Sequence, residues 1–191
     1  MQGEKRHRFF GYGSLVNRKT HAYPQGERVT VAGWRRAWRH TTFHPAPFLT
    51  AVPDPTGRID GLSAEVPGGD WVALDRREAG YLRQPLPEGP SIYHIPEDLH
   101  PAPDAAHPIL LSYLDVVVQG YLAEYGEQGV ERFFRTTDGW DAPIRDDRAA
   151  PVYPRAQTLT LQETGLVDDW LRQLHEAPLL PVENTSGGIG G

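Results

Sequence analysis

The sequence contains no cysteine, only two lysines, and no apolar run that approaches the length of a membrane-spanning helix. Without cysteine, the chain forms no disulfide, no catalytic thiolate and no cysteine-ligated zinc or iron–sulfur site. A membrane helix needs about 20 consecutive apolar residues. The charged start, residues 1–8, is not followed by the apolar segment of a secretory signal. From these absences we expect a cytoplasmic protein that makes no membrane contact.

A basic excess is also missing from the chain. The net charge is -6 and the isoelectric point is about 5.7, whereas proteins that bind nucleic acid without sequence preference usually carry a positive surplus. We therefore expect no nucleic-acid partner. A length of 191 residues suits one domain, which we assign to residues 7–178. Residues 1–6 and 181–191 have the composition of flexible tails.

The first half of the chain has the pattern of short strands, and the second half has the pattern of helices. Clusters of proline, glycine and aspartate separate the strands, which cover residues 7–12, 27–34, 35–43, 48–52, 58–66, 81–86 and 91–95. Apolar residues recur at helical spacing after Asp70, a predicted N-cap, and in residues 108–125, which begin with Pro108, 128–135 and 162–175. This order indicates an α+β fold. We expect a small mixed β-barrel with flanking helices.

Two glycines end the first strand, in the run Gly-Tyr-Gly-Ser-Leu at residues 11–15. A dinucleotide fingerprint would need glycine at Val16, and a nucleophile elbow would need it at both Tyr12 and Val16. A P-loop would need a Gly-Lys-Ser/Thr run, which the sequence lacks. Two interpretations remain. The stretch is either a plain turn with Ser14 as an N-cap, or a place where the backbone amides of residues 13–15 meet an anion or oxyanion.

A carboxylate extends the apolar face of the short helix that follows Asp70. Glu78 lies four residues after Leu74 and seven after Trp71, so the three side chains share one helical face. A carboxylate that faces a core or cleft is costly to ionise, and its pKa should rise. A glutamate of that kind can act as a general acid/base near neutral pH. The alternative is a glutamate that pairs with Arg77 or Arg83 at the helix end, or that points into water.

Both stretches carry a resemblance to a known family. Tyr-Gly-Ser-Leu at residues 12–15 follows the first strand, and Leu-Asp-x-x-Glu at residues 74–78 precedes a Gly-Tyr pair. More weakly, Tyr113 is followed seven residues later by Gly120. Over roughly residues 8–175 the sequence resembles a bacterial branch of the gamma-glutamylcyclotransferase-like family. The resemblance implies a small mixed β-barrel with flanking helices, and neither a cofactor nor a metal.

The resemblance also implies an activity. The protein would be a cofactor-independent enzyme, of the acyltransferase or lyase type, that acts on a small-molecule gamma-glutamyl substrate. The α-amine of the substrate would attack its own side-chain carbonyl and release 5-oxoproline together with a free amine or amino acid. Glu78 would be the general acid/base. The substrate-binding residues would be Tyr12, Gly13, Ser14, Leu15 and Tyr113.

The resemblance leaves the substrate and the oligomeric state open. Residues 136–140 and 146–148 match none of the patterns that divide the family among gamma-glutamyl dipeptides, glutathione, and amines or isopeptides. Arg148, Tyr153 and Arg155 could reach the cleft and bind a carboxylate, although residues 138–156 are more typical of a solvated loop.

Other candidate sites have weaker patterns. His40 and His44 share a strand face, but no third ligand is evident, so we expect no metal site. Trp34 and Trp38 stand among arginines, as in some binders of single-stranded nucleic acid. In a strand, however, the two tryptophans share one face with Arg36 beside them, which favours core packing. A further group lacks the spacing of a calcium loop and is expected to form turns: Asp138, Asp141, Asp146 and Asp147.

Two alternative functions remain open at this point. The first is a non-catalytic ligand-binding module on the same fold, since a fold does not fix a function. The second is an amide hydrolase in which Glu78 activates a water molecule.

Overall fold

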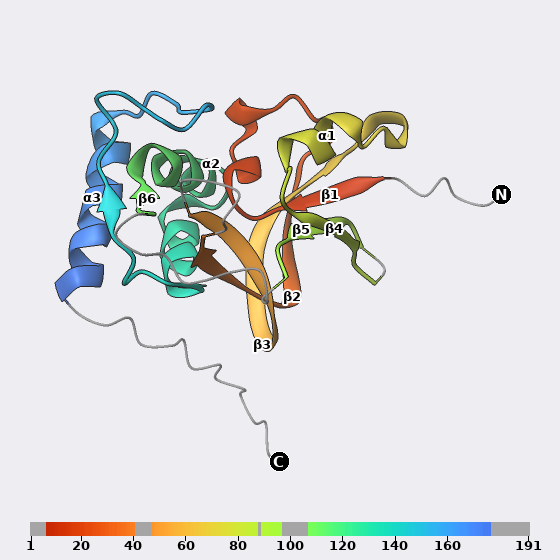
Figure 1. Ribbon diagram of the computed structural model, residues 1–191, viewed down its shortest axis with the longest axis horizontal. Coiled ribbons are helices and arrows are strands. Elements are labelled where there is room, and N and C mark those ends of the chain that lie inside the picture. Colours follow the sequence, from red (N-terminus) through yellow and green to blue (C-terminus); the bar gives the residue numbers. More distant parts are fainter. Residues whose placement is uncertain (1–6, 41–46, 88, 97–106, 177–191) are drawn as a thin grey trace, which may run out of the picture.

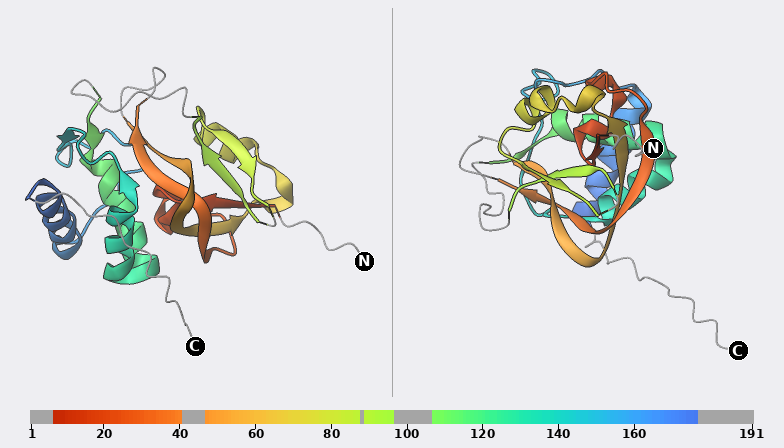
Figure 2. Two further views of the ribbon diagram at one scale, coloured as in Figure 1. Left: turned by 90° about the horizontal axis from the view of Figure 1, so that it is seen from below. Right: turned by 90° about the vertical axis from the view of Figure 1, so that its right-hand side faces the viewer.

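The computed structural model describes residues 7–40, 47–87, 89–96 and 107–176 (Figure 1). A mixed sheet packs against α2, and α3 covers the far side of α2, so that α2 lies between them (Figure 2). The predicted α+β class is therefore confirmed. The predicted tails lie outside the described residues.

The main sheet has six strands in the order β4-β5-β1-β3-β2-β7. The β1–β3, β2–β3 and β4–β5 pairs are antiparallel, whereas the β1–β5 and β2–β7 pairs are parallel. In the described parts of the chain, β4 and β7 are the edges and do not pair with each other, so the sheet is open. The predicted closed barrel is not found. The strands are β1 Arg8–Gly11, β2 Glu27–Arg39, β3 Phe48–Glu65, β4 Leu82–Pro85, β5 Ser91–His94 and β7 Thr137–Asp138.

Two pairs of predicted short strands are each a single long strand. The predicted break after residue 34 is absent, and β2 continues across it with a register shift between Ala32 and Trp34, where Gly33 has φ of 86°. The pairing passes directly from Ala32–Arg58 to Trp34–Pro53. The turn-like residues 54–57 therefore bulge out of β3 opposite Gly33 instead of ending the strand. Residues 41–43 of the predicted strand lie outside the described part of the chain.

The helices are α1 Val72–Arg77, α2 Leu111–Arg135 and α3 Leu161–Glu176. Two 3-10 turns lie between β1 and β2, η1 Ser14–Val16 and η2 Arg18–Thr20, and a third precedes α1, η3 Pro67–Gly69. The two helices predicted at residues 108–125 and 128–135 are the two halves of α2, which Gly126 interrupts with φ of 67°. Among the helices of the described ranges, none is long and apolar enough to cross a membrane.

The prediction that Pro108 starts a helix is wrong. Ile109 and Leu110 form a short strand, β6, that pairs in parallel with β8, Ile144–Arg145. The amide of Ile109 also donates a hydrogen bond to the carbonyl of Pro143 at 2.8 Å. These contacts hold the backbone extended until Leu111, because strand pairing satisfies groups that a helix would otherwise need to satisfy.

The tryptophan–arginine stretch of β2 packs into the core, as its alternation predicted. Trp38 and Arg36 have no exposed surface. The Arg36 side chain bonds the hydroxyls of Thr136, Thr137 and Tyr121 and the carbonyl of Asp60 at 2.5–3.1 Å. Burial lowers the pKa of this guanidinium below its usual range. The hydroxyl of Tyr121 in turn contacts the carbonyl of Tyr12 at 2.8 Å, which fixes the chain just after β1 to α2.

The turn after β1 also lies directly against α2. The side-chain amide of Asn17 donates hydrogen bonds to the carbonyl of Val116 and to the side chain of Gln119, both at 2.9 Å. A Cβ atom on Gly120 would lie 2.7 Å from the backbone nitrogen of Asn17. Only glycine therefore allows the helix and the turn to approach this closely.

We predict that Gly120→Ala lowers the free energy of unfolding by about 1–3 kcal/mol, because the new methyl group meets backbone and not a mobile side chain. The matched control is Gly165→Ala in α3, where a Cβ meets nothing within 4 Å. This second change should stabilise by about 0.5–1 kcal/mol. Urea unfolding of both variants measures the difference, and equal stabilities would contradict the close approach.

Candidate active site

All six predicted site residues line one small pocket, of about 30 Å³. They come from three separate parts of the chain: the turn after β1, the end of α1 and the first turn of α2. Phe10, Gly11 and Tyr93 complete the lining. Of these, the sequence had indicated only Gly11, as a turn residue. The pocket residues are Phe10, Gly11, Tyr12, Gly13, Ser14, Leu15, Glu78, Tyr93 and Tyr113.

The turn after β1 requires glycine at two positions. A Cβ on Gly11 would lie 2.4 Å from the Cβ of Leu15, and a Cβ on Gly13 would lie 2.8 Å from the hydroxyl oxygen of Tyr113. Gly13, not Ser14, precedes the first residue of η1, and no side chain caps that turn. The interpretation of Ser14 as an N-cap is therefore wrong. The backbone of Ser14 lies beside the hydroxyl of Tyr113 and opposes the rise in the pKa of that phenol.

Glu78 ends α1 and turns its carboxylate toward this turn. Its side chain is 16% exposed, and one carboxylate oxygen lies 3.2 Å from Nε of Arg77. Burial raises the pKa of Glu78, although the charges of Arg77 and Arg155 act in the opposite direction. The raised pKa that the sequence predicted is thus found. Of the two predicted alternative partners, Arg77 contacts Glu78, whereas Arg83 pairs with Asp75 at 2.9 Å.

Arg77 connects Glu78 to the turn. Its terminal nitrogens donate hydrogen bonds to the carbonyl of Thr20 at 2.8 Å, the hydroxyl of Thr20 at 3.0 Å and the hydroxyl of Ser14 at 3.3 Å. The sequence had suggested Arg77 only as a partner for Glu78. The structure shows that it also holds the segment of residues 14–20 beside the carboxylate.

Comparison with solved structures identifies the fold. YkqA from Bacillus subtilis aligns with a TM-score of 0.57 and 13% identity, over 75% of this chain and 58% of that one. A protein named gamma-glutamyl cyclotransferase aligns with a TM-score of 0.51 and 13% identity, over 86% of this chain and 99% of its own. This chain has the gamma-glutamyl cyclotransferase fold. An uncharacterized protein from Homo sapiens aligns similarly, with a TM-score of 0.52, 13% identity and coverage of 86% and 99%.

At such low identity the likeness concerns the fold, and the sequence resemblance is confirmed at that level. No protein-family model matches the chain, and no curated protein does either. The chain spans less than two thirds of the length of YkqA.

Tyrosines form much of the wall in this cyclotransferase fold. The hydroxyl of Tyr12 donates a hydrogen bond to the carbonyl of Tyr93 at 2.5 Å and accepts one from the amide of Ala51 at 3.1 Å. Its one proton is therefore already used in a hydrogen bond within the protein. Burial raises the pKa values of Tyr81 and Tyr113 well above their usual range, and nearby Glu78 adds to the effect. Both phenols therefore stay protonated. Tyr81, which lies outside the pocket lining, donates to the carbonyl of Leu49 at 3.0 Å, whereas Tyr113 lines the pocket and can donate to a ligand.

The loop after α2 contributes to the rim of the site. The ring of Tyr153 packs edge-on against Tyr113 with centroids 4.9 Å apart, and Arg155 acts electrostatically on Glu78. Arg148 instead bonds both oxygens of Asp115 at 2.7 and 2.8 Å and one oxygen of Asp168 at 2.7 Å. The solvated-loop interpretation is therefore wrong for these side chains. The packing of Tyr153 depends on contacts between distant segments and has no local sequence signal.

The aspartates of this loop have structural partners. Asp147 accepts hydrogen bonds from the amide and hydroxyl of Ser112 at 2.8 and 2.6 Å and from the amide of Val152 at 2.8 Å. Asp138 binds Arg35 through both oxygens at 2.6 Å. Within the ranges that the structure describes, no group of three potential metal ligands lies together. His44, one of the two histidines considered as metal ligands, lies outside those ranges.

We predict that Glu78→Gln changes how stability depends on pH. The folded pKa of Glu78 lies above its ordinary value of 4.5, so the wild type loses stability as the pH rises from about that value through the folded pKa. A glutamine has no proton to lose. The melting temperature of the variant relative to the wild type should therefore increase between pH 4 and pH 8.

The matched control for this experiment is Glu127→Gln, an exposed carboxylate on the second half of α2. Its melting curve should follow that of the wild type at every pH. Parallel curves for Glu78→Gln and the wild type would mean that Glu78 is not buried as described.

Proposed function

We propose that the protein is a gamma-glutamyl cyclotransferase, which converts a gamma-glutamyl amide or dipeptide into 5-oxoproline and a free amine or amino acid. The observation that carries the proposal is the position of Glu78: a partly buried carboxylate with a raised pKa shares one pocket with the turn of residues 12–15. The similarity in fold to a solved gamma-glutamyl cyclotransferase supports it.

The substrate supplies its own nucleophile. Its α-amine has an ordinary pKa of about 8, so at neutral pH a base must first remove a proton. The ionised carboxylate of Glu78 takes that proton, and the amine then forms a bond to the γ-carbonyl carbon. Holding the substrate in the bent conformation replaces a large entropic barrier, on the order of 7–11 kcal/mol for well-oriented intramolecular attack.

The attack places negative charge on the carbonyl oxygen. Backbone amides of residues 13–15 lie at the start of η1, where a helical turn leaves its first amides without partners inside the turn. Amides of this kind stabilise an oxyanion by roughly 3–4 kcal/mol each. The protonated hydroxyl of Tyr113, beside Gly13, is a further donor for the glutamyl group.

Collapse of the intermediate completes the reaction. The original amide bond breaks, and Glu78 returns its proton to the leaving nitrogen. No water is consumed, since one C–N bond forms as another breaks. A glutamyl group is larger than a pocket of about 30 Å³, so we expect side chains at the rim to move when substrate binds.

The test is turnover of gamma-glutamyl dipeptides, gamma-glutamyl amines, gamma-glutamyl-lysine and glutathione. The wild type should release 5-oxoproline from at least one of them. Glu78→Gln should lower kcat by about 10²–10⁴-fold, the usual contribution of a positioned acid/base. Glu127→Gln, which changes an exposed carboxylate outside the pocket, should keep full activity. Full 5-oxoproline production by Glu78→Gln would contradict the assigned base.

Other products would identify the alternative functions. Free glutamate that carries ¹⁸O after reaction in labelled water would indicate an amide hydrolase, in which Glu78 activates water. Binding of a gamma-glutamyl compound without any turnover would indicate a ligand-binding module. A cyclotransferase forms 5-oxoproline without ¹⁸O, because water does not attack the carbonyl.

A further inference from the structure

Arg155 lies on a tightly anchored turn at the rim of the pocket. The amide of Val152 bonds Asp147 at 2.8 Å, the amide of Tyr153 bonds the hydroxyl of Ser112 at 3.3 Å, and the amide of Ala156 bonds the carbonyl of Tyr153 at 3.1 Å. Ser112 belongs to the first turn of α2, whereas Asp147 and Tyr153 belong to the loop itself. The backbone on both sides of Arg155 is therefore held by the scaffold.

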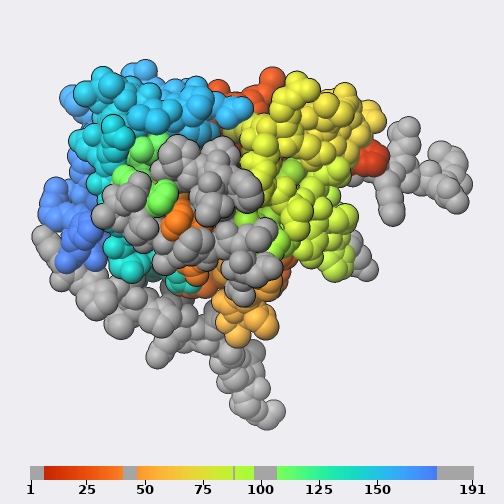
Figure 3. Space-filling view, viewed as in Figure 1, coloured from red at the N-terminus to blue at the C-terminus, as the bar shows by residue number. Residues whose placement is uncertain are grey.

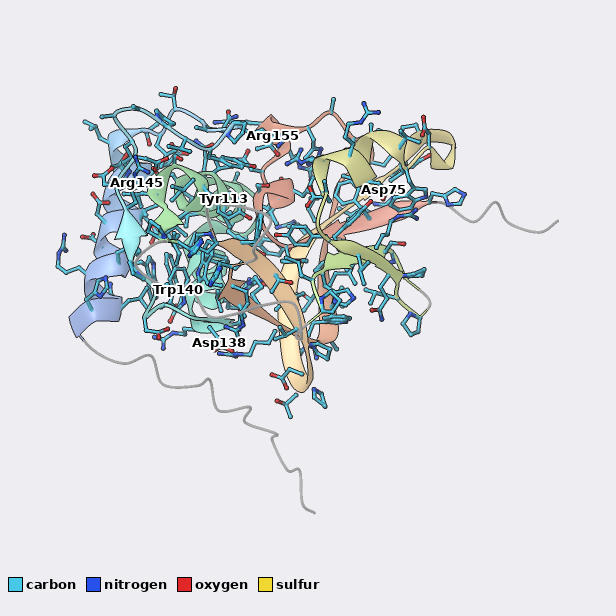
Figure 4. The ribbon with its side chains drawn as sticks, viewed as in Figure 1. Asp75, Tyr113, Asp138, Trp140, Arg145 and Arg155 are labelled. Carbon is cyan, nitrogen blue, oxygen red and sulfur yellow. The ribbon has the colours of Figure 1, made fainter. Side chains whose placement is uncertain are left out.

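The turn reaches the site from across the molecule. Figure 3 shows the segment around residues 145–160, coloured cyan to light blue, extending over one edge of the molecule toward the yellow region of α1. Figure 4 places Arg155 next to the turn that follows β1, whereas Arg145, on the same loop, lies toward α3. Arg155 is not among the residues that line the pocket, so it lies at the rim and not in the interior.

The guanidinium of Arg155 lies near enough to Glu78 for its charge to lower the pKa of that carboxyl, but it does not contact it. Its side chain is partly buried, and it makes no ion pair or hydrogen bond with any described residue. The neighbouring arginines differ in this respect, because Arg77 bonds Thr20, Ser14 and Glu78, and Arg148 bonds two aspartates. A partly buried guanidinium whose donors make no hydrogen bond to any described residue is suited to bind an anionic ligand.

We propose that Arg155 binds a carboxylate on the leaving-group side of the substrate, so that the enzyme acts on gamma-glutamyl amino acids or peptides in preference to gamma-glutamyl amines. This inference rests on the proposed function. The glutamyl group enters the pocket, where the amides of residues 13–15 and Tyr113 are available to it. The part of the substrate beyond the scissile bond then extends toward the rim, where Arg155 lies. A guanidinium can bind a carboxylate through two parallel hydrogen bonds.

Two compounds that differ only by this carboxylate test the proposal. They are gamma-glutamyl-alanine and gamma-glutamyl-ethylamide, for which kcat/KM and, by calorimetry, Kd are measured. The wild type should prefer gamma-glutamyl-alanine. Arg155→Gln should weaken binding and kcat/KM for gamma-glutamyl-alanine by about 10- to 100-fold, the range for hydrogen bonds to charged groups. For the ethylamide, Kd should stay within about twofold of the wild type, and the loss of kcat/KM should be smaller than for gamma-glutamyl-alanine, because only the effect of Arg155 on Glu78 remains.

Two further variants make the comparison specific. Arg155→Lys keeps the charge but not the paired donors, so it should restore only part of the preference. Arg145→Gln removes an exposed arginine from the same loop and should behave like the wild type with both compounds. Circular dichroism and melting temperature should be unchanged in Arg155→Gln, whose guanidinium bonds no described residue.

Several outcomes would overturn the proposal. An equal loss for both compounds would mean that Arg155 acts on the glutamyl part or on Glu78 and not on the leaving group. A wild type that binds both compounds equally would exclude the preference itself. If neither compound yields 5-oxoproline, the proposed function fails, but calorimetry still decides the role of Arg155. A carboxylate-dependent loss of affinity in Arg155→Gln supports that role, and unchanged affinity rejects it.

Discussion

The guanidinium of Arg36 is fully buried between the sheet and α2, and oxygen atoms of uncharged groups receive its hydrogen bonds. An unsatisfied buried donor of this kind costs about 1–3 kcal/mol, and more when it is charged. The oxygens must therefore stay in place around it. Because they belong to β3, to α2 and to the segment that follows α2, one side chain of β2 fixes the relative positions of the sheet and the helices.

The same network extends to the pocket. Tyr121 accepts a hydrogen bond from Arg36 and contacts the carbonyl of Tyr12, which places the turn after β1. Asn17 then fastens the far end of that turn to α2, and Arg77 joins it to Glu78. A carboxylate with a raised pKa is kept beside backbone amides by contacts that the folded core already requires. Such preorganisation reduces the reorganisation that a reaction would otherwise need.

Much of this architecture could be predicted from local patterns. The glycines that end β1 and the position of Glu78 on an apolar helix face indicated two candidate stretches, and the family resemblance placed both in one site and added Tyr113. The features that could not be predicted depend on contacts between segments that are far apart in the sequence. The bulge opposite Gly33 lets β3 continue through a turn-like sequence, and the pairing of β6 with β8 delays the start of α2. The contacts of Tyr93 and Tyr153 join residues far apart in the sequence, so no periodicity could indicate them.

Asp147 connects α2 to the loop that forms part of the pocket rim. It ties the first residues of α2, next to Tyr113, to the start of the turn that carries Tyr153 and Arg155. Glu78 and the backbone turn come from the N-terminal half of the chain, whereas this part of the rim comes from a loop that Asp147 and Arg148 hold to α2. Substitutions between Asp147 and α3 can therefore change the rim of the pocket without altering the contacts that hold Glu78 beside the turn of residues 12–15. Under the proposed function, a few changes in this one loop would alter which substrates bind and leave Glu78 and the turn in place.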